Sequence, residues 1–186
     1  MNSQQLEITL QEPHVHLTKK MIRTLFGETA KLTSRVPTDM PGKFMAVQSV
    51  MVTGPSGESV ELPILGPSAP RTQVELTPAQ ARKLGVDAKV ELSGHGTAGG
   101  VTLKGEAGEA SLETGVMIPQ PHIHMPPEDA STLSLLEGQV ISLETPDGRR
   151  LDNVAVRISH LCSNRIHLLA DDDCPFREDD IFHIVG

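Results

Sequence analysis

Glycine and proline interrupt this sequence so often that only short elements of secondary structure can form between them. The 186 residues include 16 glycines and 14 prolines, distributed along the whole chain. Between these breaks, residues 6–10, 45–52 and 58–65 alternate apolar and polar side chains with the period of a β-strand. Helical spacing is confined to three short segments, 19–26, 79–84 and 128–136. The pattern therefore predicts a mainly β protein with tight turns and argues against a helix bundle.

A weak internal repeat in the sequence indicates how these strands and helices are arranged. A strand, a helix cap, one or two helical turns, a glycine and a further strand follow one another around residues 14–27, 75–92 and 122–144. Such repeats occur in small closed barrels whose rims carry short helices. We therefore expect two small, pseudo-duplicated β-barrel domains capped by short α-helices, with residues 30–43 forming a loop.

The composition of the chain argues against several classes of function. With four Phe and no Trp or Tyr, the core must be built from aliphatic side chains and Met. A formal net charge of −8 leaves no basic patch for general nucleic-acid binding. No apolar run is long enough to cross a membrane, and the N-terminal sequence lacks the features of a secretory leader. Cys162 and Cys174 suit a reducing compartment, so we expect a soluble protein of the cytoplasm.

Two histidine pairs of the same design are the strongest functional signal. His14 and His16 follow Pro13, and His122 and His124 follow Pro121. On a strand, residues i and i+2 face the same way, so each pair presents two imidazoles side by side. A single pair of this kind is usually no more than a half-exposed strand, but two with the same flanks favour metal binding. Zinc suits sites that combine imidazole with carboxylate.

Two acidic residues are alternative candidates for the carboxylate ligand beside these histidine pairs. Glu75 lies on the predicted strand around residues 73–76, on the same strand face as Arg71. Glu128 follows His124 by four residues, and this spacing resembles the first metal motif of cupins. However, Glu128 would lie in the first turn of a helix, where the helix dipole alone explains an acidic residue.

A glycine-rich segment at residues 93–100 is a further candidate. Ser93 and the glycines from Gly94 to Gly100 could form a backbone nest for an anion. A surface loop without a ligand has the same composition, and both interpretations stay open.

These motifs, taken in order, resemble those of the PduL-type phosphotransacylases, or phosphate propanoyltransferases. The resemblance rests on HVHL, LGP followed by TQVEL, the Ser-Gly loop, HIHM-x-PEDA and a late histidine on a strand, and it spans nearly the whole chain. Members of this family exchange an acyl group between coenzyme A and orthophosphate, often inside bacterial microcompartments. Their compartment-targeted members carry an amphipathic extension before the first strand, and this chain starts almost on that strand. We therefore expect the cytoplasm, with a microcompartment lumen as the alternative.

The resemblance also implies a domain plan, cofactors and substrates. Residues 1–13 and 120–186 would form one barrel, residues 44–113 the other, and residues 14–43 a connecting helix and loop. One of two zinc ions would be held by His14, His16 and Glu75, with an open position for the coenzyme A sulfur. The other would be held by His122, His124 and His167 and completed by waters. The implied partners are acyl-CoA, phosphate or acyl phosphate, and a second copy of the chain in a homodimer.

The chain departs from the family pattern at the phosphate site. The arginine that family members carry six residues before the metal-binding glutamate is here Ala69, and Pro13 replaces the arginine that usually precedes the first pair. Arg71 is the nearest candidate to hold phosphate; on a regular strand its Cα would lie about 7 Å further along. Ser93 matches the serine of the family's phosphate-side loop.

Three hypotheses follow from the sequence. The first is a zinc-dependent phosphate acyltransferase weakened by the change at Ala69, because losing a bidentate guanidinium from a phosphate site is a large change. The second is a non-catalytic relative that binds zinc and coenzyme A. The third is a cupin-like metalloenzyme that uses Glu128.

Overall fold

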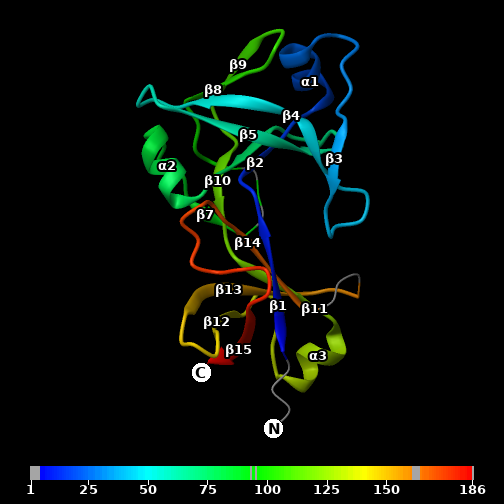
Figure 1. The fold of residues 1–186 in the computed structure, drawn as a ribbon, viewed down its shortest axis with the longest axis vertical. Helices are drawn as coiled ribbons and strands as arrows, with labels where there is room; N and C mark the ends of the chain where they lie inside the picture. Colours follow the sequence, from blue (N-terminus) through cyan, green and yellow to red (C-terminus); the bar gives the residue numbers. More distant parts are fainter. Residues whose placement is uncertain (1–4, 93, 95, 161–163, 186) are drawn as a thin grey trace. The chain divides into compact units, whose positions relative to one another are not determined.

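The computed structural model describes residues 5–92, 94, 96–160 and 164–185, and these form two compact β units. One unit combines the chain up to Gln11 with the chain from Pro119 onward, and the other runs Glu12–Ile118. The prediction of a mainly β fold with short helices is confirmed (Figure 1). Within the described residues, no helix has the length and apolar character needed to cross a membrane.

The first unit is a closed barrel of six strands. Their order around the barrel is β1-β14-β11-β13-β12-β15, and β1 pairs with β15 to close it. β1 runs parallel to β14 and β11 parallel to β13, while the remaining pairs are antiparallel. The strands are β1 (Leu6–Gln11), β11 (His122–Met125), β12 (Val140–Glu144), β13 (Arg150–Ile158), β14 (Arg165–Leu169) and β15 (Ile181–Val185).

The second unit is a nine-stranded sheet that curls into a half-barrel. Its order is β7-β10-β6-β2-β5-β4-β8-β9, with β3 paired to β4 beside this path. The strands are β2 (His14–His16), β3 (Ser34–Pro37), β4 (Phe44–Thr53), β5 (Ser59–Gly66), β6 (Gln73–Glu75), β7 (Val90–Glu91), β8 (Val101–Lys104), β9 (Glu109–Leu112) and β10 (Val116–Pro119). The short strand β2 lies between β6 and β5, so the first histidine pair is in the middle of the sheet.

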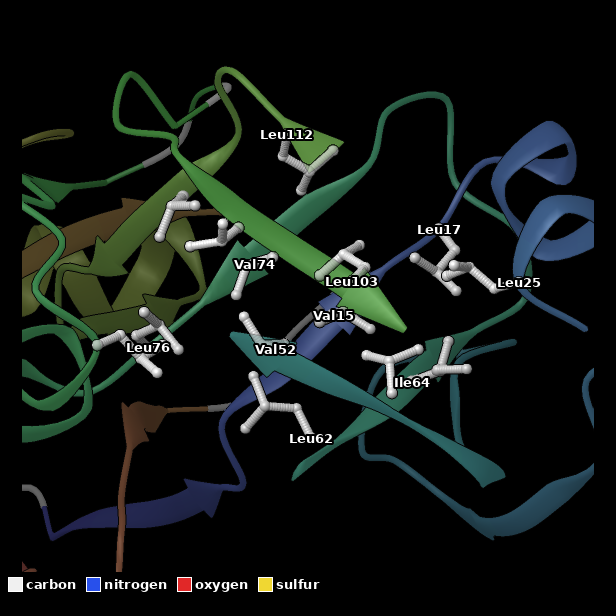
Figure 2. Packing of buried hydrophobic residues seen from close by; sticks show 14 of the residues in the cluster. Val15, Leu17, Leu25, Val52, Leu62, Ile64, Val74, Leu76, Leu103 and Leu112 are labelled. Atoms are coloured by element: carbon white, nitrogen blue, oxygen red, sulfur yellow. The ribbon is translucent and has the colours of Figure 1, made fainter. Parts of the chain in front are cut away.

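Aliphatic side chains fill the core of the second unit, as the shortage of aromatic residues predicts. Figure 2 shows side chains of successive strands gathered against one another, among them Val15, Val52, Ile64, Val74 and Leu103. All five are fully buried. Because Val15 faces this core, the histidines on either side of it in β2 face the other way.

Two short helices of this unit begin and end where their capping residues predict. Helix α1 (Lys19–Phe26) starts at Thr18, whose hydroxyl accepts the N–H of Met21, and ends at Gly27. Helix α2 (Pro78–Leu84) starts at Thr77 and ends at Gly85, which has a left-handed backbone with φ of 72°. The N-terminal caps thus fix the residue at which each helix begins, shortly after β2 and β6 end.

Three expectations about elements were wrong. The segment 30–43, expected to be loop, contains β3, which pairs with β4. The strand expected at 89–92 is the shorter β7. The helix expected over 128–136 is α3 (Pro127–Thr132), because Ser134 takes a positive φ of 56° and the following turn buries Leu135 in the barrel core. Residues 14–43 lie within the second unit and supply β2, α1 and β3.

Candidate metal centres

The first histidine pair meets Glu75 through the pairing of two neighbouring strands. β2 and β6 are antiparallel, and their register sets His14 opposite Glu75 and His16 opposite Gln73. Residues opposite one another in such a pair project from the same face of the sheet, with Cβ atoms about 5 Å apart. Three potential ligands, His14, His16 and Glu75, therefore gather on one face of the second unit; we call them the first histidine group.

The distances within the first histidine group match a metal-binding triangle. The Nε2 atoms of His14 and His16 are 3.2 Å apart. The Glu75 carboxylate lies 2.9 Å from Nε2 of His14 and 3.2 Å from Nε2 of His16. Ligand atoms about 2.0–2.1 Å from a tetrahedral zinc lie about 3.3 Å apart. The donor set and its spacing thus fit zinc.

Backbone hydrogen bonding fixes which His14 nitrogen points into this triangle. Nδ1 of His14 lies 2.8 Å from the carbonyl oxygen of Glu12. A carbonyl can only accept, so Nδ1 carries the proton and donates it. In the neutral ring, Nε2 is then left with its lone pair toward Glu75 and His16, as in metal sites where a second hydrogen bond orients the ligand.

Burial and the histidine–carboxylate contacts set the proton affinities of the group. Burial would raise the pKa of Glu75, but hydrogen bonds from His14 and His16 and their positive charge hold that pKa well below its ordinary value. Burial would lower the pKa of His14, but the hydrogen bond and negative charge of Glu75 outweigh it, so that pKa is raised. The group is therefore built to hold a positive charge, which a proton or a metal cation can supply.

The second histidine group consists of His122, His124 and His167, all in the first unit. His122 and His124 lie on β11, and His167 on the antiparallel neighbour β14 is directly opposite His122. The ligand atoms of this group, like those of the first, lie within 4.8 Å of one another. Nδ1 of His122 donates to the carbonyl of Gln120 at 3.2 Å, the same i−2 arrangement that orients His14.

Two arginines that sequence reasoning missed flank the second group. Strand register sets Arg157 of β13 on one side of His124 and Arg165 of β14 on the other. Arg157 pairs with Glu137 at 3.2 Å, and Arg165 pairs with Glu7 and donates to Thr9. No local motif marks either arginine, because only the pairing of remote strands brings them to His124.

The sequence-based placement of Arg71 is wrong. It assumed a regular strand from Arg71 to Glu75, but β6 begins at Gln73 and Arg71 lies in a bend before it. Arg71 is exposed and forms no ion pair with any described residue. The backbone N–H of Ala69 donates to the carbonyl of Leu17 at 2.8 Å, which places Ala69 beside the chain that leaves His16.

Of the two other candidates, Glu128 lies apart from both histidine groups, and Ser93 is not among the residues that the structure describes. Glu128 is exposed in the first turn of α3 and belongs to neither group of potential ligands in the described part of the chain. Its neighbour Asp129 accepts a hydrogen bond from Asn164. Ser93 lies outside the described residues.

Comparison with known proteins gives one consistent result. A family model described as phosphate propanoyltransferase matches residues 7–177. A phosphate propanoyltransferase from Shewanella putrefaciens is 36% identical over 177 residues, covering 92% of this chain and 83% of the relative. Those from Enterococcus faecalis and Thermotoga maritima are each 35% identical, over 170 and 164 residues, covering 89% and 86% of this chain and 80% and 78% of theirs.

Proposed function

The chain belongs to the phosphate propanoyltransferase family and is an acyltransferase, and we propose that it exchanges a short acyl group between coenzyme A and orthophosphate with two zinc ions. The observation that carries the zinc part of this proposal is the pair of three-ligand histidine groups, one in each unit. Two such groups in one chain of this family suit a reaction with two reacting centres, the thioester, whose sulfur leaves with negative charge, and the phosphate anion.

The residues of the two groups suit different tasks. The first would hold its metal through His14, His16 and Glu75, leaving a fourth position for the sulfur of coenzyme A. The second would hold its metal through His122, His124 and His167, with no carboxylate among the three ligands. When bound, zinc supplies Lewis-acid stabilisation of sulfur and oxygen atoms that gain negative charge.

The covalent change is a direct transfer between the two substrates. A phosphate oxygen attacks the thioester carbonyl carbon, the carbon–sulfur bond breaks, and the sulfur leaves with its electron pair. The proton that phosphate gives up balances the thiol, so the products are acyl phosphate and coenzyme A. No side chain of the protein needs to carry the acyl group.

We also propose Arg71 and Ser93 as residues that hold the phosphate. Arg71 is supported by its exposure and by the lack of an ion pair with any described residue, since its guanidinium is available to an incoming anion. Ser93 is supported by its match to the serine of the family's phosphate-side loop.

Product analysis tests the proposed reaction. Zinc-loaded protein is incubated with propanoyl-CoA and phosphate, free thiol is titrated, and acyl phosphate is trapped as its hydroxamate. We expect thiol and acyl phosphate in equal amounts, and neither when phosphate is omitted. Zinc and coenzyme A binding without either product would support the non-catalytic alternative instead.

A further inference from the structure

The carbonyl group that orients His122 belongs to Gln120, and the side chain of this glutamine is itself anchored. Nδ1 of His122 donates to the Gln120 carbonyl oxygen at 3.2 Å. The Gln120 amide nitrogen in turn donates to two oxygens of Asn153, the backbone carbonyl at 3.1 Å and Oδ1 at 3.0 Å. Because a backbone carbonyl can only accept, the nitrogen of the Gln120 amide, and not its oxygen, must face Asn153. Gln120 therefore links Asn153 to a potential metal ligand within the first unit.

Asn153 can accept this contact because β13 contains a bulge at its position. The register between β12 and β13 shifts between Ile141 and Leu143, so that one residue of β12 is set against two of β13. Asn153 is one of these two, and its backbone is left-handed, with φ of 61°. Asparagine is one of the few residues other than glycine that adopt this region readily. A bulge takes the extra residue out of the regular ladder, and here the carbonyl of that residue accepts from Gln120.

Gln120 lies outside the strands on either side of it, since it follows β10 and precedes β11. The carbonyl of Pro121 accepts the N–H of Ala155 at 2.9 Å, which ties the chain entering β11 to β13. The hydrogen bonds from the Gln120 side chain to Asn153 extend this attachment to β13 by one residue. The residue reached in this way is the one whose carbonyl accepts from His122.

We propose that Gln120 is a positioning residue for the second histidine group, which acts through its contact with Asn153 to hold its own carbonyl against Nδ1 of His122. The Nδ1–H of that ring is then fixed, and the lone pair of Nε2 is left for a metal ion. Partners of this kind set the tautomer and orientation of a ligating histidine, and their loss weakens metal binding. The inference rests on the proposed function, because it requires that the second group hold a metal. Gln120 is not itself one of the potential ligands.

Two substitutions at Gln120 and one at Asn153 test this contact. Gln120→Ala removes the donor, and Gln120→Glu keeps the length of the side chain but has a carboxylate that cannot donate. Asn153→Asp keeps both acceptor oxygens and a residue type that tolerates the left-handed region, so it is the conservative variant. Gln139→Ala is the matched control, because Gln139 is another glutamine of the first unit that is bonded to backbone: its Oε1 accepts the N–H of Leu136 at 3.0 Å.

The first measurement needs neither metal nor activity. Nitrogen NMR of the metal-free full chain, labelled in histidine and held at a pH above the histidine pKa values, shows which ring nitrogen carries the proton. We expect Nδ1 for His122 in the wild type, and about threefold more of the Nε2–H tautomer in both Gln120 variants, since the acceptor of Nδ1 is no longer fixed. His14 is an internal control, because the carbonyl that it contacts belongs to Glu12, whose side chain pairs with Arg35.

The second measurement is the zinc affinity of each histidine group. Competition with a chromophoric chelator is fitted to two sites, and the same titration of Glu75→Ala, in which only the second group keeps all its ligands, assigns them. For both Gln120 variants we expect the second group to bind zinc about three- to tenfold more weakly, the size of one lost hydrogen bond behind a ligand. The first group should be unchanged, and Asn153→Asp and Gln139→Ala should match the wild type at both groups.

Each contrary result overturns the proposal. An unchanged His122 tautomer in both Gln120 variants would show that the contact with Asn153 does not orient the ring. A changed tautomer with unchanged zinc affinity would show that this orientation does not serve the metal, and an equal loss in Asn153→Asp or Gln139→Ala would show a general effect on stability. If the wild type binds zinc but transfers no acyl group to phosphate, the proposed reaction fails, while these two measurements still decide the role of Gln120.

Discussion

At the scale of single residues, His14 and His122 are oriented in the same way although they lie in different units. Each donates through Nδ1 to a backbone carbonyl two residues earlier, that of Glu12 or Gln120. The proline between donor and acceptor, Pro13 or Pro121, has a fixed φ and no N–H to compete for that carbonyl. In the Pro-His-x-His motif, the first histidine is therefore oriented so that its Nε2 points toward the other potential ligands of its group.

Removing a carboxylate distinguishes the two candidate acidic ligands. In Glu75→Ala we expect zinc content to fall from two ions per chain to one, because the first histidine group loses a ligand 2.9 Å from Nε2 of His14. Glu128→Ala is the matched control and should keep both ions, since Glu128 lies outside both groups. Metal analysis after dialysis gives the answer, and loss of an ion in Glu128→Ala alone would favour the cupin-like arrangement.

The raised pKa of His14 predicts a pH dependence. Below its ordinary pKa, His14 is protonated and its contact with Glu75 stabilises the metal-free protein in full; this contribution is lost as the pH rises through the raised folded-state pKa. Metal binding needs neutral His14, so zinc affinity should increase over the same pH range, with proton release. Calorimetry in buffers of different ionisation enthalpy measures the protons released. A zinc affinity that does not change with pH in this range would contradict the assignment of His14.

Restoring an arginine at position 69 should strengthen phosphate binding. The Ala69 backbone is tied to Leu17, immediately after the first histidine pair, so a long cationic side chain there starts close to the first group. For Ala69→Arg we expect a KM for phosphate about tenfold lower, as a charge-assisted bidentate contact supplies. Ala69→Gln is the uncharged control. Steady-state kinetics with equal effects in both variants would show that charge at this position plays no part.

At the scale of elements, the cap that follows β6 holds the end of the strand that carries Glu75. The Thr77 hydroxyl accepts the N–H of Gln80 at 3.2 Å, and the Gln80 side chain accepts the N–H of Thr77 at 3.1 Å. Thr77 is also buried, at 4% exposed. The start of α2 therefore follows Glu75 by only a few residues and is held by the two hydrogen bonds of this capping box.

Loss of this cap should reduce stability more than it reduces metal binding. For Thr77→Ala we expect the free energy of unfolding to fall by about 1 kcal/mol, with two zinc ions still bound. Thr77→Ser keeps the hydroxyl and should recover most of the loss. Urea unfolding of the three proteins measures it, and an unchanged midpoint in Thr77→Ala would mean that the capping box contributes nothing to the fold.

The elements that sequence analysis predicted well are those with local signals. Thr18 and Gly27 delimit α1, and alternation over 45–52 indicates β4. β3 was missed because all four of its side chains are exposed, so no alternation of burial marks it. The length of α3 was overestimated because Leu133 and Leu135 continue an apolar pattern, although they pack into the barrel from a turn.

At the scale of the whole molecule, sequence-remote partners complete both histidine groups. Periodicity predicts that His14 faces the same way as His16, but it does not bring Glu75 to them, 59 residues further on. Nor does it bring His167 to His122, since that contact depends on β11 pairing with β14. Resemblance to a family suggested both partners. Arg157 and Arg165 were not found in this way, because their place beside His124 depends on strand register.

The metal dependence of phosphate-driven thiol release tests the central claim most directly. The initial rate with propanoyl-CoA is measured against phosphate concentration for zinc-loaded protein, for protein stripped by chelator, and for stripped protein with zinc restored. We predict a rate that saturates with phosphate, disappears on stripping and returns with zinc. An equal rate in the stripped protein, or thiol release that does not depend on phosphate, would contradict a zinc-dependent acyl transfer to phosphate.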